Sequence, residues 1–199
     1  MTVRLTTSDG HPLAADVVDP DGMPAAAVVV CHPHPLYGGN RYHPVVDAVF
    51  RLAPTTGIRA IRFDFRADHD NGRGERLDLV AALEAIASGA TGPAFVVGYS
   101  FGAAVAMTTE DDRIAAVVAV APPLVATSPP PVRPTLILTP SDDQFCPPAA
   151  AAAIAATWPV DGPDVALEVV DSADHFLLGR ADEIARRAIS WISDRIDGS

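Results

Sequence analysis

Short apolar runs rich in β-branched residues recur along the chain, and they alternate with segments whose apolar residues return every three or four positions. The first pattern predicts buried strands, and the second predicts helices with one apolar face. Regular alternation of the two is typical of a largely parallel sheet, so the sequence predicts an α/β fold. The predicted strands are Val3–Thr7, Leu13–Val18, Ala27–Cys31, Ile58–Phe63, Ala94–Gly98, Ile114–Val120, Thr135–Thr139 and Val165–Val170.

The helical segments between the strands carry apolar stripes that should face the core. The stripes consist of Val45, Val46, Val49 and Phe50, then Leu79, Leu83 and Ile86, and finally Ile184, Ala188, Trp191 and Ile192. Pro147–Trp158 is rich in alanine, which has the lowest helix cost, and it is also expected to be helical. The first two strands flank Ser8-Asp9-Gly10 and should form an antiparallel hairpin at the edge of a mixed sheet.

Length and charge narrow the class of protein. The chain has 199 residues, which favours a single domain covering 1–199. Its net charge of -11 would repel nucleic acids and anionic membranes, so neither is expected as a partner. No apolar run approaches the ~18 residues of a membrane span, and the first ten residues lack the apolar core of a signal peptide. We therefore expect a cytoplasmic protein.

The clearest chemical motif is Gly98-Tyr99-Ser100-Phe101-Gly102, which matches G-x-S-x-G. It follows a buried strand and precedes the small-residue helix Ala103–Met107, which is the context in which a serine hydroxyl projects from a tight strand-to-helix turn. Flanking glycines leave room for that turn, and the helix N-terminus favours developing negative charge. Ser100 is therefore the candidate nucleophile.

A nucleophilic serine needs a histidine base and an acid. In proteins that carry the serine at this type of turn, the acid follows the serine in the chain and the histidine follows the acid. His175 is the one histidine after Ser100, and it lies just beyond the last predicted strand. The acid should also follow the carboxyl end of a strand. Asp142 and Asp143 both do so, whereas the carboxylates at 110–112 precede their strand.

The segment His32–Gly39 reads H-P-H-P-L-Y-G-G. With it, nearly the whole chain resembles the α/β-hydrolase superfamily, particularly its small dienelactone-hydrolase-like members. The resemblance implies an α/β-hydrolase fold with a mostly parallel eight-stranded sheet and helices on both faces. In such proteins the strand before the acid usually ends H-G-x-x-D, with a proline four residues on. Thr139–Asp143 and Pro147 fit if Asp143 is the acid, with Asp142 as the alternative.

Two segments depart from what is usual in these proteins. Thr139-Pro140 replaces His-Gly, which bears on the placement of the acid, and Arg66–Asp70 replaces a more glycine-rich loop. Asp68, His69 and Asp70 could suggest a metal, but we interpret them as a solvated loop, and no metal site is expected. Pro122–Pro134 is too short to hold an inserted helical lid, so the site should be open.

An oxyanion hole requires two backbone N–H donors, and the residue after the nucleophile, Phe101, supplies one. The second should come from the loop after Cys31. Because proline has no N–H, His34 is the preferred donor, with Leu36 or Tyr37 as alternatives. The residues expected to contact substrate are His32, Leu36, Tyr37 and Tyr99; the side chains of His32 and His34 would either hold the loop or touch substrate.

The sequence thus predicts a serine hydrolase acting through an acyl-enzyme, with Ser100, Asp143 and His175 as catalytic triad and no cofactor. Its partner would be a small acyl substrate, with carboxylic esters ahead of thioesters, amides and peptides. The alternative is a non-catalytic binding or scaffolding module on the same fold. Oligomeric state does not follow from these residues.

Overall fold

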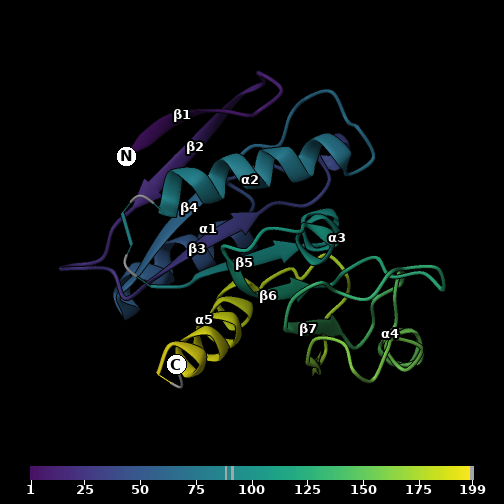
Figure 1. The fold of residues 1–199 in the computed structure, drawn as a ribbon. Coiled ribbons are helices and arrows are strands. Elements are labelled where there is room, and N and C mark those ends of the chain that lie inside the picture. Colours follow the sequence, from purple (N-terminus) through teal and green to yellow (C-terminus); the bar gives the residue numbers. More distant parts are fainter. Residues whose placement is uncertain (88, 91, 198–199) are drawn as a thin grey trace.

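A computed structural model describes residues 1–87, 89, 90 and 92–197. The chain forms one eight-stranded sheet with the spatial order β1-β2-β4-β3-β5-β6-β7-β8 (Figure 1). The strands are β1 (Thr2–Thr6), β2 (Pro12–Val18), β3 (Ala26–Cys31), β4 (Ile58–Phe63), β5 (Ala94–Tyr99), β6 (Ile114–Val120), β7 (Thr135–Pro140) and β8 (Val165–Val170). Strands β3 to β8 pair in parallel, while β2 pairs antiparallel with β1 and β4, which confirms the predicted mostly parallel sheet with an edge hairpin.

Helices cover both faces of the sheet, as predicted (Figure 1). They are α1 (Pro44–Leu52), α2 (Arg73–Ala87), α3 (Phe101–Thr108), α4 (Pro148–Ala155) and α5 (Ala181–Asp197), with short 3-10 helices η1 (Pro35–Tyr37) and η2 (Ala53–Thr56). Apolar side chains of α1 and α5 share one core cluster with the sheet, and those of α2, α3 and α4 share the other. Within the described residues, no helix combines the length and apolarity that crossing a membrane requires.

Burial on both faces explains why the central strands are continuously apolar. In β5, Phe95, Val97 and Tyr99 point into the α1–α5 core, and Ala94 and Val96 point into the opposite core. Side chains alternate in direction along a strand, so in a strand covered on both faces no side chain points to solvent, and apolar residues are favoured at every position. The lack of a polar–apolar alternation is thus a consequence of the two helix layers.

The alanine-rich helix is shorter than expected. It ends at Ala155, whereas the prediction extended it to Trp158. Proline at position 159 disfavours helical backbone at Trp158, and the indole N–H of Trp158 instead donates to the carbonyl oxygen of Ser128 at 3.2 Å. The helix after Ser100, by contrast, is longer than expected at both ends.

Because β3 to β8 run in the same direction, the loops that follow their last residues gather at one edge of the sheet. The candidate residues after β3, β5, β7 and β8 lie in these loops. The connection over residues 121–134 contains neither helix nor strand, so no lid is inserted there. The fold therefore leaves this edge uncovered by that connection.

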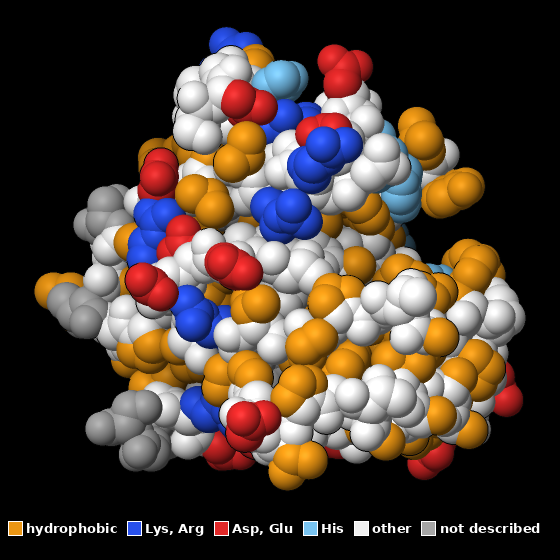
Figure 2. All heavy atoms as spheres, turned by 45° about the vertical axis from the view of Figure 1, so that its right-hand side comes forward, with side chains coloured by type: hydrophobic (Ala, Val, Ile, Leu, Met, Phe, Trp, Pro, Cys, Tyr) orange, Lys and Arg blue, Asp and Glu red, His pale blue; other side chains and the backbone are white. Residues whose placement is uncertain are grey.

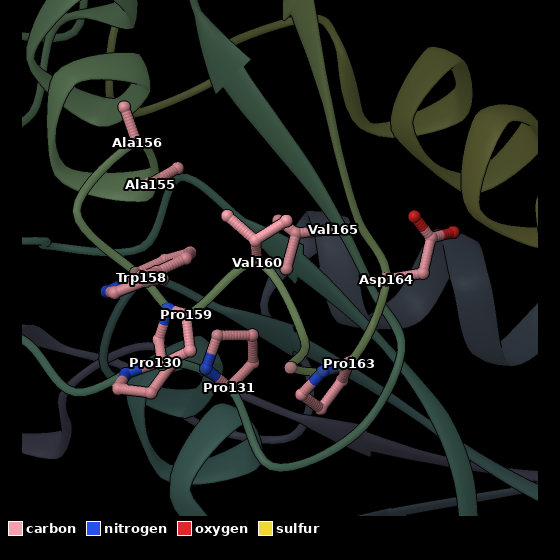
Figure 3. A pocket seen from close by; sticks show the side chains of 11 residues that line it. Pro130, Pro131, Ala155, Ala156, Trp158, Pro159, Val160, Pro163, Asp164 and Val165 are labelled. Atoms are coloured by element: carbon pink, nitrogen blue, oxygen red, sulfur yellow. The ribbon is translucent and has the colours of Figure 1, made fainter.

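A hollow of about 280 Å³ lies elsewhere, between the end of α4 and the start of β8 (Figure 3). Its walls are mainly proline, alanine and valine, with Trp158 and Asp164. The first residues of β8 lie at the edge of the sheet opposite the carboxyl ends of the strands. Among the described residues that line this hollow, Asp164 is the one ionisable side chain.

Candidate active site

The turn that carries Ser100 is tight and strained. β5 ends at Tyr99 and α3 begins at Phe101, which leaves Ser100 alone to reverse the chain. Its φ of 52° and ψ of -113° lie outside the regions that residues with a Cβ readily occupy. Such a conformation costs about 1–3 kcal/mol, and it persists only when the surrounding packing imposes it.

Two glycines make this packing possible. A Cβ on Gly98 would lie 2.4 Å from the carbonyl oxygen of Gly102, and a Cβ on Gly102 would lie 2.6 Å from the carbonyl oxygen of His32. Both distances are too short for non-bonded atoms, and both clashes are with backbone. Glycine at position 98 therefore lets the start of α3 lie close against the end of β5, and glycine at position 102 lets it lie close against the end of β3.

The structure brings together the serine, the histidine and one of the two candidate acids. Ser100 Oγ lies 2.9 Å from His175 Nε2, and His175 Nδ1 lies 2.9 Å from Asp143 Oδ2. The three residues come from the loops after β5, β8 and β7. Both distances suit hydrogen bonds, so the three side chains form one continuous series.

Asp143 is fixed as an acceptor. Its Oδ1 accepts the N–H groups of Phe145 at 2.8 Å and Cys146 at 3.0 Å, and its side chain is only 1% exposed. Burial alone would raise the pKa of Asp143, but the hydrogen bonds from His175 and these backbone groups outweigh it and lower the pKa below its ordinary value. The ionised carboxylate holds the proton of His175 on Nδ1, which leaves Nε2 to accept the hydroxyl proton of Ser100.

The other candidate acid is directed elsewhere. Asp142 is exposed, and its Oδ2 accepts the hydroxyl of Ser141 at 2.9 Å. Its backbone N–H donates to the carbonyl oxygen of Ala173, which helps to join the loops after β7 and β8. Of the two neighbouring carboxylates, the structure therefore places Asp143 against His175.

Proteins of known structure share this architecture. An α/β serine hydrolase homologue from Coxiella burnetii is 28% identical, with 96% of each chain covered and a TM-score of 0.82. A lidless α/β serine hydrolase from Xanthomonas campestris is 25% identical, with 94% of each chain covered and a TM-score of 0.77. The chain is a member of the α/β-hydrolase superfamily. The narrower likeness to dienelactone hydrolases rests on the sequence segment alone.

More distant α/β-hydrolase structures resemble the chain in fold only. Est1E from Butyrivibrio proteoclasticus is 15% identical, with 98% of this chain and 99% of that chain covered and a TM-score of 0.81. Among curated sequences, an uncharacterized protein of Rickettsia prowazekii is 35% identical over 91 residues, which are 42% of this chain and 38% of that protein. No family model matches the chain.

Tyr99 is a buried residue that holds the loop of His175 in this α/β-hydrolase site. The residue is 4% exposed, and its hydroxyl donates to the carbonyl oxygen of His175 at 2.7 Å. Burial, together with the nearby charges of Asp143 and Asp174, raises the pKa of Tyr99, so the phenol remains a neutral donor. The structure therefore gives Tyr99 a role in holding the loop of His175, and the expectation that it also contacts substrate stays a prediction.

His32 is likewise a supporting residue. It is 1% exposed, its Nδ1 donates to the carbonyl oxygen of Pro33 at 2.6 Å, and its Nε2 accepts the N–H of Phe65 at 3.0 Å. Burial lowers the pKa of His32, which keeps the ring neutral as these two bonds require. With both nitrogens used, His32 ties the loop after β3 to the chain after β4. Of the two roles expected for the His32 side chain, these contacts favour holding the loop, and substrate contact stays a prediction.

The other loop residues expected near substrate are accessible. Leu36 and Tyr37 lie in η1 and are 73% and 89% exposed. The ring of His34 lies 4.7 Å from the ring of Phe101, centroid to centroid, so the loop reaches the residue that follows Ser100. The structure thus leaves Leu36 and Tyr37 free to contact a ligand.

Two phenylalanines beside the base were not singled out from the sequence. The rings of Phe145 and Phe176 lie 4.5 Å and 5.9 Å from the ring of His175, and each residue is 60% exposed. Figure 2 shows hydrophobic side chains gathered next to histidines at the right-hand edge of this face. The available signal was a large apolar residue within two positions of the candidate acid or base, in an otherwise polar loop.

The Asp68–Asp70 segment is held by a carboxylate from α2. His69 Nδ1 lies 2.8 Å from Glu75 Oε1, and the backbone N–H of Asp70 donates to the same oxygen at 3.0 Å. In the part of the chain that the structure describes, no cluster of three or more histidine, cysteine or acidic side chains is arranged to hold a metal ion.

Proposed function

We propose that the chain is a serine hydrolase that cleaves small carboxylic esters through an acyl-enzyme. The observation that carries the proposal is the hydrogen-bonded series Ser100–His175–Asp143 at a strained strand-to-helix turn. Similarity to serine hydrolase homologues at 25–28% identity supports the same reaction class.

In the proposed reaction, His175 Nε2 takes the Ser100 hydroxyl proton as the oxygen attacks the ester carbonyl. The tetrahedral intermediate collapses when the carbon–oxygen bond to the alcohol breaks, and the imidazolium returns its proton to the departing alkoxide. Water then repeats the sequence on the acyl-enzyme and releases the acid. Asp143 remains ionised throughout, holding the ring in position and stabilising its positive charge.

The oxyanion would be bound by the backbone N–H groups of Phe101 and His34. Among the alternatives for the second donor, Leu36 N–H already donates to His34 Nδ1 at 3.2 Å, and Tyr37 N–H donates to the carbonyl oxygen of His34 at 3.0 Å. Within the described residues, no hydrogen bond engages the N–H of either Phe101 or His34. This difference favours His34, as the sequence did.

Small acyl substrates fit the site because no lid is inserted over it and it is flanked by apolar surface. Phe145 and Phe176 stand on the side of His175, and Leu36 and Tyr37 belong to the loop on the other side of Ser100. Such surfaces can cover a short acyl or alcohol group by apolar contact without enclosing it.

An activity-based probe tests the nucleophile. A fluorophosphonate should label the wild-type protein and fail to label Ser100→Ala, because only an activated serine reacts readily with such reagents. Ser141→Ala is the matched control, since Ser141 bears a partly exposed hydroxyl in the loop that carries Asp143. An unlabelled wild-type protein would favour a scaffolding module on the hydrolase fold.

Substrate class is tested by rates. Hydrolysis of 4-nitrophenyl esters of increasing acyl length should be fastest for short chains, whereas peptide anilides should be cleaved far more slowly. Ser100→Ala should abolish both. Faster cleavage of anilides than of esters would replace the esterase assignment with a peptidase.

A further inference from the structure

Three aromatic rings lie around the candidate base. The ring of Tyr99 lies 6.0 Å from the ring of His175, centroid to centroid, and those of Phe145 and Phe176 lie 4.5 Å and 5.9 Å from it. Tyr99 is 4% exposed, whereas both phenylalanines are 60% exposed. The imidazole is therefore covered from the core by a tyrosine and flanked at the surface by two phenylalanines that a ligand can reach.

The backbone around the acid and the base sets the position of the two phenylalanines. The N–H of Phe145 donates to Asp143 Oδ1 at 2.8 Å, and the N–H of Phe176 donates to Asp174 Oδ1 at 3.0 Å. The rings of Phe145 and Phe176 lie 6.5 Å apart at an interplanar angle of 83°. They thus form a nearly perpendicular pair beside His175, which we call the phenylalanine pair.

The proposed reaction brings the alcohol part of an ester to the imidazole. His175 returns its proton from Nε2 to the departing alkoxide, and a proton donor has to lie about 2.6–3.2 Å from the atom that it protonates. The alcohol oxygen therefore has to lie beside Nε2. A group bound directly to that oxygen then lies within reach of the rings that flank the imidazole.

The second proposed oxyanion donor comes from the other side of Ser100. The N–H of His34 belongs to the loop after β3, and β3 lies on one side of β5 in the sheet. β7 and β8, whose loops carry the phenylalanine pair, lie on the other side of β5. The order of the strands therefore separates the two parts of the ester, with the oxyanion toward the loop after β3 and the alcohol toward the loops after β7 and β8.

The phenylalanine pair favours an aromatic group over an aliphatic one. Aromatic rings attract one another in edge-to-face and offset arrangements with centroids about 4.5–7 Å apart, and such contacts contribute beyond the apolar area that they bury. Both rings of the pair belong to residues that are more than half exposed, so a third ring beside the imidazole can adopt such an arrangement with them. An aliphatic group in the same place would gain from buried area alone.

We propose that Phe145 and Phe176 bind the alcohol part of the substrate and make the enzyme selective for esters of phenols. The inference rests on the proposed esterase function, because the return of the proton by His175 is what brings the alcohol to these rings. Neither phenylalanine side chain belongs to the hydrogen-bonded series Ser100–His175–Asp143. The two residues would therefore determine which alcohol is accepted and not the reaction itself.

Two acetates isolate the contribution of the alcohol. Phenyl acetate and hexafluoroisopropyl acetate form the same acetyl-enzyme and release alcohols of similar acidity, so the ratio of their kcat/KM values reports contacts of the alcohol. Phe145→Leu should lower this alcohol ratio about threefold or more, which is the effect of one lost aromatic contact, and adding Phe176→Leu should lower it further. Val160→Ala should leave the ratio unchanged, since Val160 is fully exposed beside the distant hollow of Figure 3.

The acyl part supplies an internal control. Phe145→Leu should leave the ratio of kcat/KM for 4-nitrophenyl acetate and 4-nitrophenyl butyrate unchanged, because these two esters share their alcohol. Partial loss of folded protein cancels in each ratio, and Phe176→Leu alone repeats the test should Phe145→Leu not fold.

The outcomes separate this inference from the esterase assignment. An unchanged alcohol ratio despite Ser100-dependent hydrolysis, or a change in the acyl ratio alone, would overturn the role of the phenylalanine pair and leave the esterase standing. Absence of Ser100-dependent hydrolysis of all four esters would instead overturn the esterase, and the inference with it.

Discussion

The two adjacent carboxylates after β7 provide a matched test of the proposed mechanism. Asp143→Asn and Asp142→Asn make the same chemical change at neighbouring positions. Asp143 is buried against His175, whereas Asp142 is exposed and bonded to a serine hydroxyl. The structure therefore predicts a large loss of activity for Asp143→Asn and little loss for Asp142→Asn.

The expected loss at position 143 follows from the tautomer of His175. An asparagine can keep one oxygen for the N–H groups of Phe145 and Cys146, which turns its NH2 group toward His175 Nδ1. Nδ1 must then accept, the ring proton moves to Nε2, and the base can no longer take the proton of Ser100. Loss of the carboxylate in such triads lowers kcat by about 10⁴-fold, equivalent to about 5.5 kcal/mol of transition-state stabilisation.

The assay is steady-state hydrolysis of 4-nitrophenyl acetate, with thermal unfolding of each variant as a folding control. Asp142→Asn should retain kcat/KM within about twofold, because its carboxylate accepts the Ser141 hydroxyl and lies outside the hydrogen-bonded series of Ser100, His175 and Asp143. An Asp143→Asn variant that is folded and retains most of its activity would refute the reasoning. So would an equal loss in Asp142→Asn.

Three further predictions concern stability. Gly102→Ala should lower the free energy of unfolding by about 1–3 kcal/mol or more in urea titration, because its Cβ would lie 2.6 Å from a backbone oxygen; an unchanged value would contradict the packing argument. His32→Ala should cost about 1–3 kcal/mol by leaving the Phe65 N–H without its acceptor, and unaltered protection of that amide in hydrogen exchange would count against it. Because the folded pKa of Asp143 is lowered, its contribution to stability is present above its unfolded pKa and is lost as pH falls through the folded value. The difference in unfolding free energy between wild type and Asp143→Asn should therefore shrink on acidification, and a difference that grows instead would reverse the sign of this linkage.

The sequence by itself determined the class of fold and the set of candidate catalytic side chains. Strands buried between two helix layers require continuous apolar runs. These runs can be recognised in the sequence, and they predict the strands. The requirement for glycine at position 98 is similarly local, because the clash that it avoids is with the backbone of Gly102, whereas the clash avoided at Gly102 is with His32, which is distant in sequence. The chain order of serine, acid and histidine left His175 as the one candidate for the base. The catalytic role of His175 stays a prediction.

Tertiary structure decided which groups actually meet. Asp142 and Asp143 are chemically identical, and only the path of the loop after β7 turns one of them inward. Burial of His32 and Tyr99 likewise depends on neighbours distant in sequence, the N–H of Phe65 and the carbonyl of His175. The contact of His34 with His69 arises because β3 and β4 are adjacent in the sheet. Such pairings follow from strand order and loop geometry, which depend on the packing of the whole chain and not on any local pattern of residues.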